Sequence, residues 1–101
     1  MFEEVRRYSE DADVIFEKLK RVSKKAGFEI DRIDEPNRRL NLSTGLSLLS
    51  YGENVEVIVN REKEGGSKVY VSSSPKVFFN ITANTKRNVQ RVFEALEEEN
   101  R

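Results

Sequence analysis

The sequence predicts an α+β domain in which two helices pack on one face of an antiparallel sheet, and two periodicities carry this prediction. Two segments repeat apolar residues at intervals of three and four, which is the spacing of a helix with one buried face. Between them, apolar and polar residues alternate, as in strands with one buried face. The chain of 101 residues is close to the commonest single-domain size, so we expect residues 1–101 to form one domain. The expected order of elements is β-α-β-β-β-α.

The first two elements are an edge strand over residues 2–8 and a helix over residues 10–26. Ser9 is the expected N-cap of the helix, because acidic residues follow in the first turn. Gly27 supplies the left-handed residue that commonly follows a helix. The apolar stripe of this helix consists of Ala12, Ile15, Phe16, Leu19, Val22 and Ala26.

A meander is expected after this helix. Residues 28–33 and 39–45 form a hairpin, since Pro36 and Asn37 between them favour a turn. Valines then alternate with polar residues up to position 59, and they resume on the same inward face after a glycine turn at 62–66. Residues 76–83 have two open interpretations, a strand that continues past a kink at Pro75 or a loop over the sheet end.

The last helix has Asn84 as a candidate cap and a stripe of apolar residues on one face. The glutamates at 97–99 oppose the helix dipole, so we expect this end to fray. The residues that we expect in the core on the strength of both periodicities are Phe16, Leu19, Val57, Val71 and Phe93.

Composition argues against catalysis and metal binding. The sequence has no Cys and no His, which removes the thiolate nucleophile, the commonest general base near neutral pH and the commonest transition-metal ligand. The serines lack such a base, and the glutamates lack the spacing of a calcium loop. We therefore expect no enzyme activity, no cofactor and no metal. The residues weighed are Ser43, Ser47, Ser50, Ser72, Ser73, Ser74, Glu53, Glu56, Glu62 and Glu64.

Membrane insertion and export are not predicted. No segment reaches the roughly 18 apolar residues that a transmembrane helix needs. The acidic stretch Met1–Val5 lacks the apolar core of a signal peptide. We expect a soluble, cytoplasmic protein.

Two apolar segments form the candidate interaction surface, because exposed apolar patches commonly mark binding sites. They are residues 46–51 and 77–81. The alternative is that their side chains plug the end of the sheet. In an extended chain Phe78 and Phe79 point in opposite directions, and the parity of the valines predicts that Phe79 is buried and Phe78 exposed. The candidate surface residues are Leu46, Leu48, Leu49, Tyr51, Tyr70 and Phe78.

Several short motifs resemble those of small microbial α+β domains of unknown function. They are Ala26-Gly27-Phe28-Glu29-Ile30, Ser50-Tyr51-Gly52-Glu53, Ser72-Ser73-Ser74 and Asn88-Val89. The order of strand, glycine-terminated helix, meander and C-terminal helix also resembles a shortened helix-grip arrangement of the Bet v 1/START-like group. That resemblance implies an apolar ligand cavity, and the smaller number of strands here predicts that the cavity is not large.

These observations favour a non-catalytic binding or protein-interaction module. A protein partner or self-association is preferred, and a small apolar ligand is the alternative. A nucleic-acid-binding accessory domain is a further alternative, because basic residues cluster on the first helix and recur at positions 38–39 and 86–91. The basic residues concerned are Lys18, Lys20, Arg21, Lys24, Lys25, Arg38, Arg39, Lys86, Arg87 and Arg91.

The charge balance predicts weak binding to nucleic acid. Eighteen Lys and Arg offset eighteen Asp and Glu, so no net field attracts phosphates. We expect a dissociation constant of about 10⁻⁴ M or weaker for random oligonucleotides at physiological salt. Fluorescence anisotropy measures this affinity, and a sub-micromolar value would overturn the ranking of functions.

Overall fold

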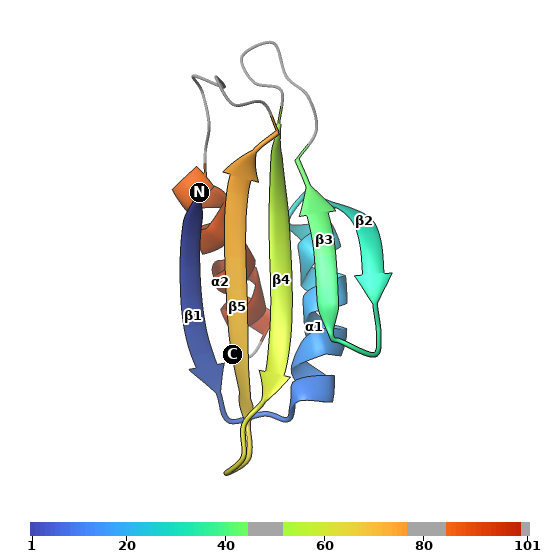
Figure 1. Ribbon diagram of the computed structural model, residues 1–101, viewed down its shortest axis with the longest axis vertical. Coiled ribbons are helices and arrows are strands. Elements are labelled where there is room, and N and C mark those ends of the chain that lie inside the picture. The colour runs from blue at the N-terminus through green and yellow to red at the C-terminus, as the bar shows by residue number, and fades with distance from the viewer. Residues whose placement is uncertain (45–51, 77–84, 100–101) are drawn as a thin grey trace.

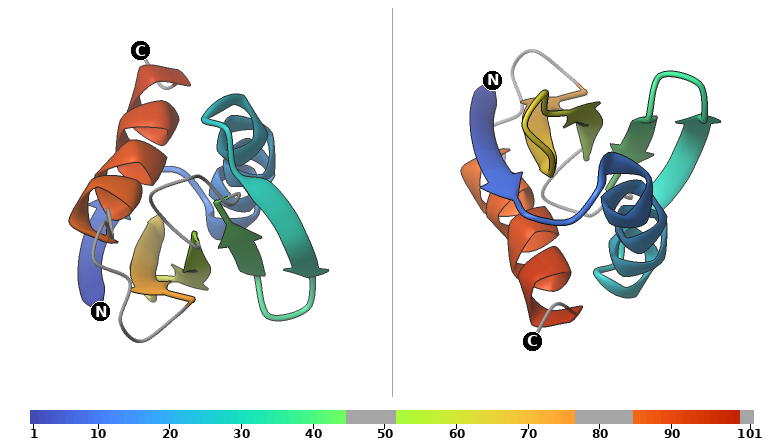
Figure 2. Two further views of the ribbon diagram at one scale, coloured as in Figure 1. Left: turned by 90° about the horizontal axis from the view of Figure 1, so that it is seen from above. Right: turned by 90° about the horizontal axis from the view of Figure 1, so that it is seen from below.

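The computed structural model describes residues 1–44, 52–76 and 85–99, which form a five-stranded antiparallel sheet and two helices (Figure 1). Both helices lie on the same face of the sheet (Figure 2), so the predicted α+β class and its layering are confirmed. The strands are β1 (Phe2–Tyr8), β2 (Glu29–Asp34), β3 (Arg39–Ser43), β4 (Glu53–Arg61) and β5 (Ser67–Pro75), and the helices are α1 (Ala12–Lys25) and α2 (Thr85–Glu99).

The element order is β-α-β-β-β-β-α, with one strand more between the helices than the predicted order contains. The valines on either side of the glycine turn belong to two separate strands, β4 and β5. Gly65 and Gly66 both have positive φ, and they let the chain reverse between these strands. A Cβ on Gly66 would lie 2.5 Å from the carbonyl oxygen of Tyr8, so this turn also packs closely on the end of β1.

The strands lie side by side in the order β1-β5-β4-β3-β2, with every neighbouring pair antiparallel. The predicted edge position of residues 2–8 is therefore confirmed, and β2 forms the other edge. The β2–β3 hairpin has a bulge between Ile30 and Arg32, which explains why Ile33 falls out of phase with Ile30 in the sequence. The bulge places Ile33 opposite the buried Leu40, and Ile33 is 45% exposed at this edge of the sheet. The residue with positive φ in the hairpin turn is Arg38.

Helix α1 begins later than predicted, and its N-cap is Asp11 rather than Ser9. The Asp11 carboxylate accepts a hydrogen bond of 3.0 Å from the backbone N–H of Asp13, while its own backbone is extended. A carboxylate binds the free N–H groups of the first turn and also favours the positive end of the helix dipole. At the other end Gly27 has a φ of 94°, as predicted for a helix terminus.

The core fills the layer between the sheet and the helices. All five predicted core residues are buried, and they belong to one cluster with the remaining inward-facing valines and leucines. The inward-facing valines of the long strands β4 and β5 all belong to this cluster. The two runs of alternating valines therefore predicted the buried face of the sheet. The predicted helical stripes of α1 and α2 supply the opposite side of the layer.

Helix α2 stays helical through Glu99, contrary to the expected fraying, because its terminal carboxylates have partners. Glu97 accepts hydrogen bonds of 2.7 Å from the Arg6 guanidinium and 2.8 Å from the Tyr8 hydroxyl. Arg21 forms an ion pair with Glu99 and lowers the pKa of that carboxyl. Burial and the bond to Glu97 raise the pKa of Tyr8. The candidate cap Asn84 lies outside the described residues.

Phe93→Ala tests the layer between α2 and the sheet. Phe93 is fully buried, and removing its ring leaves a cavity, so we expect a loss of about 3–5 kcal/mol in the free energy of unfolding. Chemical denaturation followed by circular dichroism measures this loss. Val14→Ala is the control, because Val14 is 47% exposed and its truncation should change stability by about 0.5 kcal/mol or less. Equal losses for the two variants would contradict the assignment of the buried face.

Candidate functional site

A buried carboxylate lies at one end of the apolar layer. Glu53, the first residue of β4, is only 2% exposed and shares the inward phase of the strand's valines. The hydroxyl of Ser73 on β5 donates a hydrogen bond of 2.8 Å to Oε1 of this carboxylate. The hydroxyl of Thr85, at the start of α2, donates one of 3.3 Å to Oε2. Two strands and a helix therefore converge on a single acidic side chain.

Backbone hydrogen bonds fix the position of Glu53. Its N–H donates to Oγ1 of Thr44 over 2.8 Å, and the N–H of Thr44 donates to the carbonyl of Glu53 over 3.0 Å. The N–H of Lys76 donates to the carbonyl of Gly52 over 3.2 Å. Gly52 has a φ of 89°, a conformation that favours glycine. The end of β3, the start of β4 and the end of β5 are thus joined beside the carboxylate.

No Lys or Arg in the described ranges forms an ion pair with Glu53. The segments 45–51 and 77–84, which connect the residues around it, contain no Lys, Arg or His in their sequences. Buried carboxylates in proteins are normally paired with a cation, because desolvating a lone charge is costly. Glu53 is therefore the charged group whose environment most needs a functional explanation.

The predicted interaction surface can be placed only at Tyr70, since Leu46, Leu48, Leu49, Tyr51 and Phe78 lie outside the described residues, as does Phe79. Tyr70 is half-buried on the face of the sheet away from the helices, as its parity predicted. Its hydroxyl forms a hydrogen bond with Glu3. It lies in one row of the sheet between Val5 and Ile58.

The described serines do not converge on one site. Ser73 points into the core toward Glu53, whereas Ser43 donates a hydrogen bond of 3.1 Å to Asp31 at the β2 edge. Ser72 and Ser74 line a different hollow, of about 550 Å³, on the outer face of the sheet. Alternation along the strand separates neighbouring hydroxyls onto opposite faces.

Three basic residues of α1 have acidic partners. Lys18 pairs with Glu10 at 2.9 Å, and Arg21 pairs with Glu99. Lys20 reaches Glu17 at 2.8 Å and Glu35 at 2.5 Å. Such local neutralisation gives a solvated helix face of mixed charge instead of a basic track for phosphates.

A groove of about 560 Å³ runs between the last turns of the two helices. Val22, Ala26 and Ala95 are among its lining residues, and the other lining side chains carry charges of both signs. Arg91 spans from α2 to α1, where its guanidinium forms a hydrogen bond with the carbonyl of Ala26 and lies 4.6 Å from the ring centroid of Phe28. Arg91 of α2 thus binds a backbone carbonyl at the C-terminal end of α1.

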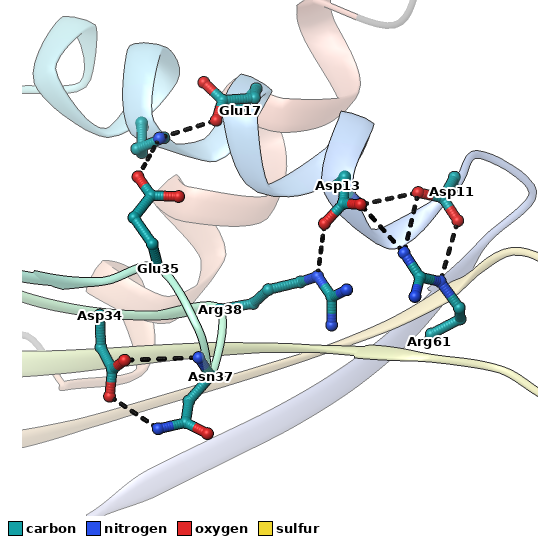
Figure 3. A network of polar contacts seen from close by, with 9 residues as sticks. Asp11, Asp13, Glu17, Asp34, Glu35, Asn37, Arg38 and Arg61 are labelled. Atoms are coloured by element: carbon teal, nitrogen blue, oxygen red, sulfur yellow. Dashed lines mark hydrogen bonds and ion pairs between the residues drawn. The ribbon is translucent and has the colours of Figure 1, made fainter.

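An ion-pair network joins the end of β4 to the start of α1 (Figure 3), and Glu53 lies at the other end of β4. Arg61 at the end of β4 pairs with Asp11 at 3.1 Å and with Asp13 at 3.0 Å. Arg38 in the hairpin turn pairs with Asp13 at 2.7 Å. The network ties the start of α1 to the sheet, and its exposed, mutually compensated charges indicate a structural role.

Neither metal binding nor membrane insertion gains support from the described residues. Within the described ranges, no three acidic side chains gather closely enough to hold a metal ion. The glutamates considered from sequence are dispersed, because Glu53 faces the core and Glu56 lines the outer hollow. Neither described helix is long and apolar enough to cross a membrane.

No protein-family model matches the chain, and a search of curated proteins finds no relative. Solved structures do match, 31 chains in all. One of them, the crystal structure of Ara h 8.0201, has a TM-score of 0.65 and is 15% identical, with 97% of this chain and 95% of that chain covered. The fold is Bet v 1-like. The helix-grip resemblance noted in the sequence is therefore confirmed at the level of fold.

In this Bet v 1-like fold, Glu53 is the residue whose role the sequence did not reveal. The sequence suggests it only as a metal ligand, together with Glu56, Glu62 and Glu64. The informative signal was present, because Glu53 stands two residues before the first of three alternating valines and so has the buried phase of the strand. An acidic residue on a buried phase marks either a paired charge or a site.

The aspartates of the ion-pair network predict loss of stability in acid. Arg61 lowers the pKa of Asp11 below its ordinary 3.8, and Arg38 lowers that of Asp13. A lowered folded-state pKa contributes stability above the unfolded-state pKa, and this stability is lost as the pH falls through the folded-state pKa. We expect the unfolding temperature to fall between about pH 5 and pH 2, less steeply in Arg61→Gln.

Thermal unfolding followed by circular dichroism at a series of pH values checks this expectation. Lys63→Gln is the control, because it removes a positive charge from the exposed turn after β4 without touching either aspartate. The control should keep the acid dependence of the original chain. An Arg61→Gln profile that parallels the control would contradict the role of the network.

Proposed function

We propose that this domain is a non-catalytic binding domain for a small amphiphilic cation, with an apolar body and a positively charged head group that pairs with Glu53. One observation carries the proposal: a carboxylate that is 2% exposed at the end of the apolar core has hydroxyl partners but no cation in the described ranges. A ligand ammonium group supplies the missing charge. A charge pair of this kind is strong where water is excluded.

The arrangement around Glu53 suits a head group with several donors. The Ser73 and Thr85 hydroxyls each use one carboxylate oxygen, and each oxygen keeps further acceptor capacity. These hydroxyls hold the carboxylate in place before a ligand arrives, which limits the ordering cost of binding. Their oxygens can also accept hydrogen bonds from an ammonium group.

The sequences that adjoin the residues around Glu53 are the reason for proposing an apolar body in the ligand. Thr44, Gly52, Lys76 and Thr85 lie at the ends of the segments 45–51 and 77–84, and these segments contain the leucines and aromatic residues of the predicted interaction surface. The Bet v 1/START-like resemblance implies an apolar ligand, and the Bet v 1-like fold is compatible with that role. The proposal therefore takes the ligand alternative of the sequence and adds a charge requirement to it.

Decylammonium, decanol and decanoate, each below its micelle concentration, test the proposal by isothermal titration calorimetry. We expect decylammonium to bind most tightly, because only its head group offers a full positive charge to Glu53. In Glu53→Gln the affinity for decylammonium should fall about thirty-fold or more, while the affinity for decanol is unchanged. The proposal fails if decylammonium binds no better than decanol, or if Glu53→Gln leaves its affinity unaltered.

Glu56→Gln is the matched control for this experiment. Glu56 lies on the same strand but lines the outer hollow, so its loss removes the same charge from the chain without touching the core. It should leave binding of decylammonium within about two-fold of the original chain, a surface effect well below that of a buried pair. Glu53→Gln itself should fold at least as stably as the original chain, because Gln keeps an acceptor for the hydroxyls and removes a buried charge.

A further inference from the structure

The free edge of β1 has the properties of a self-pairing strand. Within the described residues, β1 pairs with β5 over its full length from Phe2 to Tyr8, without a bulge, and has no strand on its other side (Figure 1). The opposite edge strand, β2, is shorter and interrupted by a bulge. Bulges and short lengths are common ways of protecting an edge from further pairing, and β1 shows neither. Charged side chains also protect edges, and β1 carries four, but their order along the strand allows them to match in a self-pair.

The sequence of β1 is complementary to itself when it is read in antiparallel directions. Centring the register on Val5 places Val5 opposite Val5 of a second copy, Glu4 opposite Arg6, and Glu3 opposite Arg7. Phe2 then lies opposite Tyr8, so the two ends of the strand match as well. Residues that face each other across an antiparallel pair have their side chains in contact, and opposite charges there are stabilising. Val5 is 48% exposed, so this apolar centre is open to a partner.

Helix α2 shows a second charge pattern with the same symmetry. It runs in the same direction as β1, because Lys86 lies 6.0 Å from the ring centroid of Phe2 and Glu97 binds Tyr8 at the other end. Its first turn has no acidic residue and its last turn no basic residue, which is the reverse of what the helix dipole favours. Arg6, Tyr8 and Arg21 bind the carboxylates at the acidic end within one copy, and a second, antiparallel α2 would add its basic start beside that end.

The two copies of α2 fit beside each other in this arrangement. The helix packs over β5 and β1, so the two axes would lie roughly two to three strand spacings apart, about 10–14 Å. Packed helices need about 8–10 Å, so the backbones do not collide and charged side chains can reach across.

We infer that two copies of this chain associate edge to edge through β1, about a two-fold axis at Val5, into one continuous antiparallel sheet. The interface contains one strand pair and the flanks of two helices, so it belongs to the small, weak class. We expect a measurable dimer at protein concentrations of about 100 μM and above. This surface is separate from Glu53, and the inference does not depend on the proposed ligand.

A charge-swap experiment tests the inference by analytical ultracentrifugation. The original chain should show a mass that rises from 11.7 kDa toward twice that value as its concentration increases. Glu3→Arg places Arg opposite Arg, and Arg7→Glu places Glu opposite Glu, so each variant alone should dimerise at least ten-fold more weakly. An equimolar mixture of the two variants should recover the dimer, because both cross-strand pairs are then of opposite charge.

The mixture distinguishes a specific strand register from general electrostatic effects or damage to the fold. Glu29→Arg, an exposed charge reversal on the β2 edge, is the control and should dimerise like the original chain. The inference is overturned if the original chain stays monomeric at about 1 mM, a concentration at which even weak interfaces associate. It is also overturned if the single variants dimerise normally, or if their mixture does not regain the dimer.

Discussion

Burial of only one face of the sheet is the constraint on which the rest of this structure depends. Both helices pack on the same side, so each strand residue is assigned to the core or to solvent by its parity alone. This assignment brings the valines of β4 and β5 together with the stripes of α1 and α2. It also places Glu53 in the layer between sheet and helices, because it occupies the same phase as the valines. The same rule leaves Val5 and Tyr70 on the uncovered face.

The elements that could be predicted from sequence are those in which periodicity and burial agree. The stripes of the two helices and the alternation of β4 and β5 are long enough to identify both the element and its buried face. The N-cap of α1 was misplaced because Ser9 and Asp11 are both good caps, and only the path of the chain out of β1 decides between them. The bulge near Ile30 was visible only as a slip in phase.

Features that depend on contacts between distant parts of the chain could not be predicted from the sequence. The terminal glutamates of α2 looked unfavourable for the dipole, but Arg6, Tyr8 and Arg21 stabilise them from elements far away in the sequence. The role of Glu53 was missed for a related reason. Its surroundings depend on residues far apart in the sequence, because the ends of β3 and β5 and the start of α2 converge beside it. Both features arise from tertiary contacts, whereas periodicity reports local structure.

The pairing of β1 with β5 has a consequence for the order in which the chain folds. Tyr8 pairs with Ser67, and Phe2 pairs with Ser73. Within the described residues, β1 therefore cannot form its strand pairing until β5 has been synthesised. The carbonyl of Ala26 likewise gains its hydrogen bond from Arg91 only after residue 91 has been synthesised. Contacts between residues so far apart in sequence slow folding, because a long loop must close before they form. During synthesis the central hairpins can assemble first, and the N-terminal strand and the end of α1 complete their native contacts only after the ribosome has released nearly the whole chain.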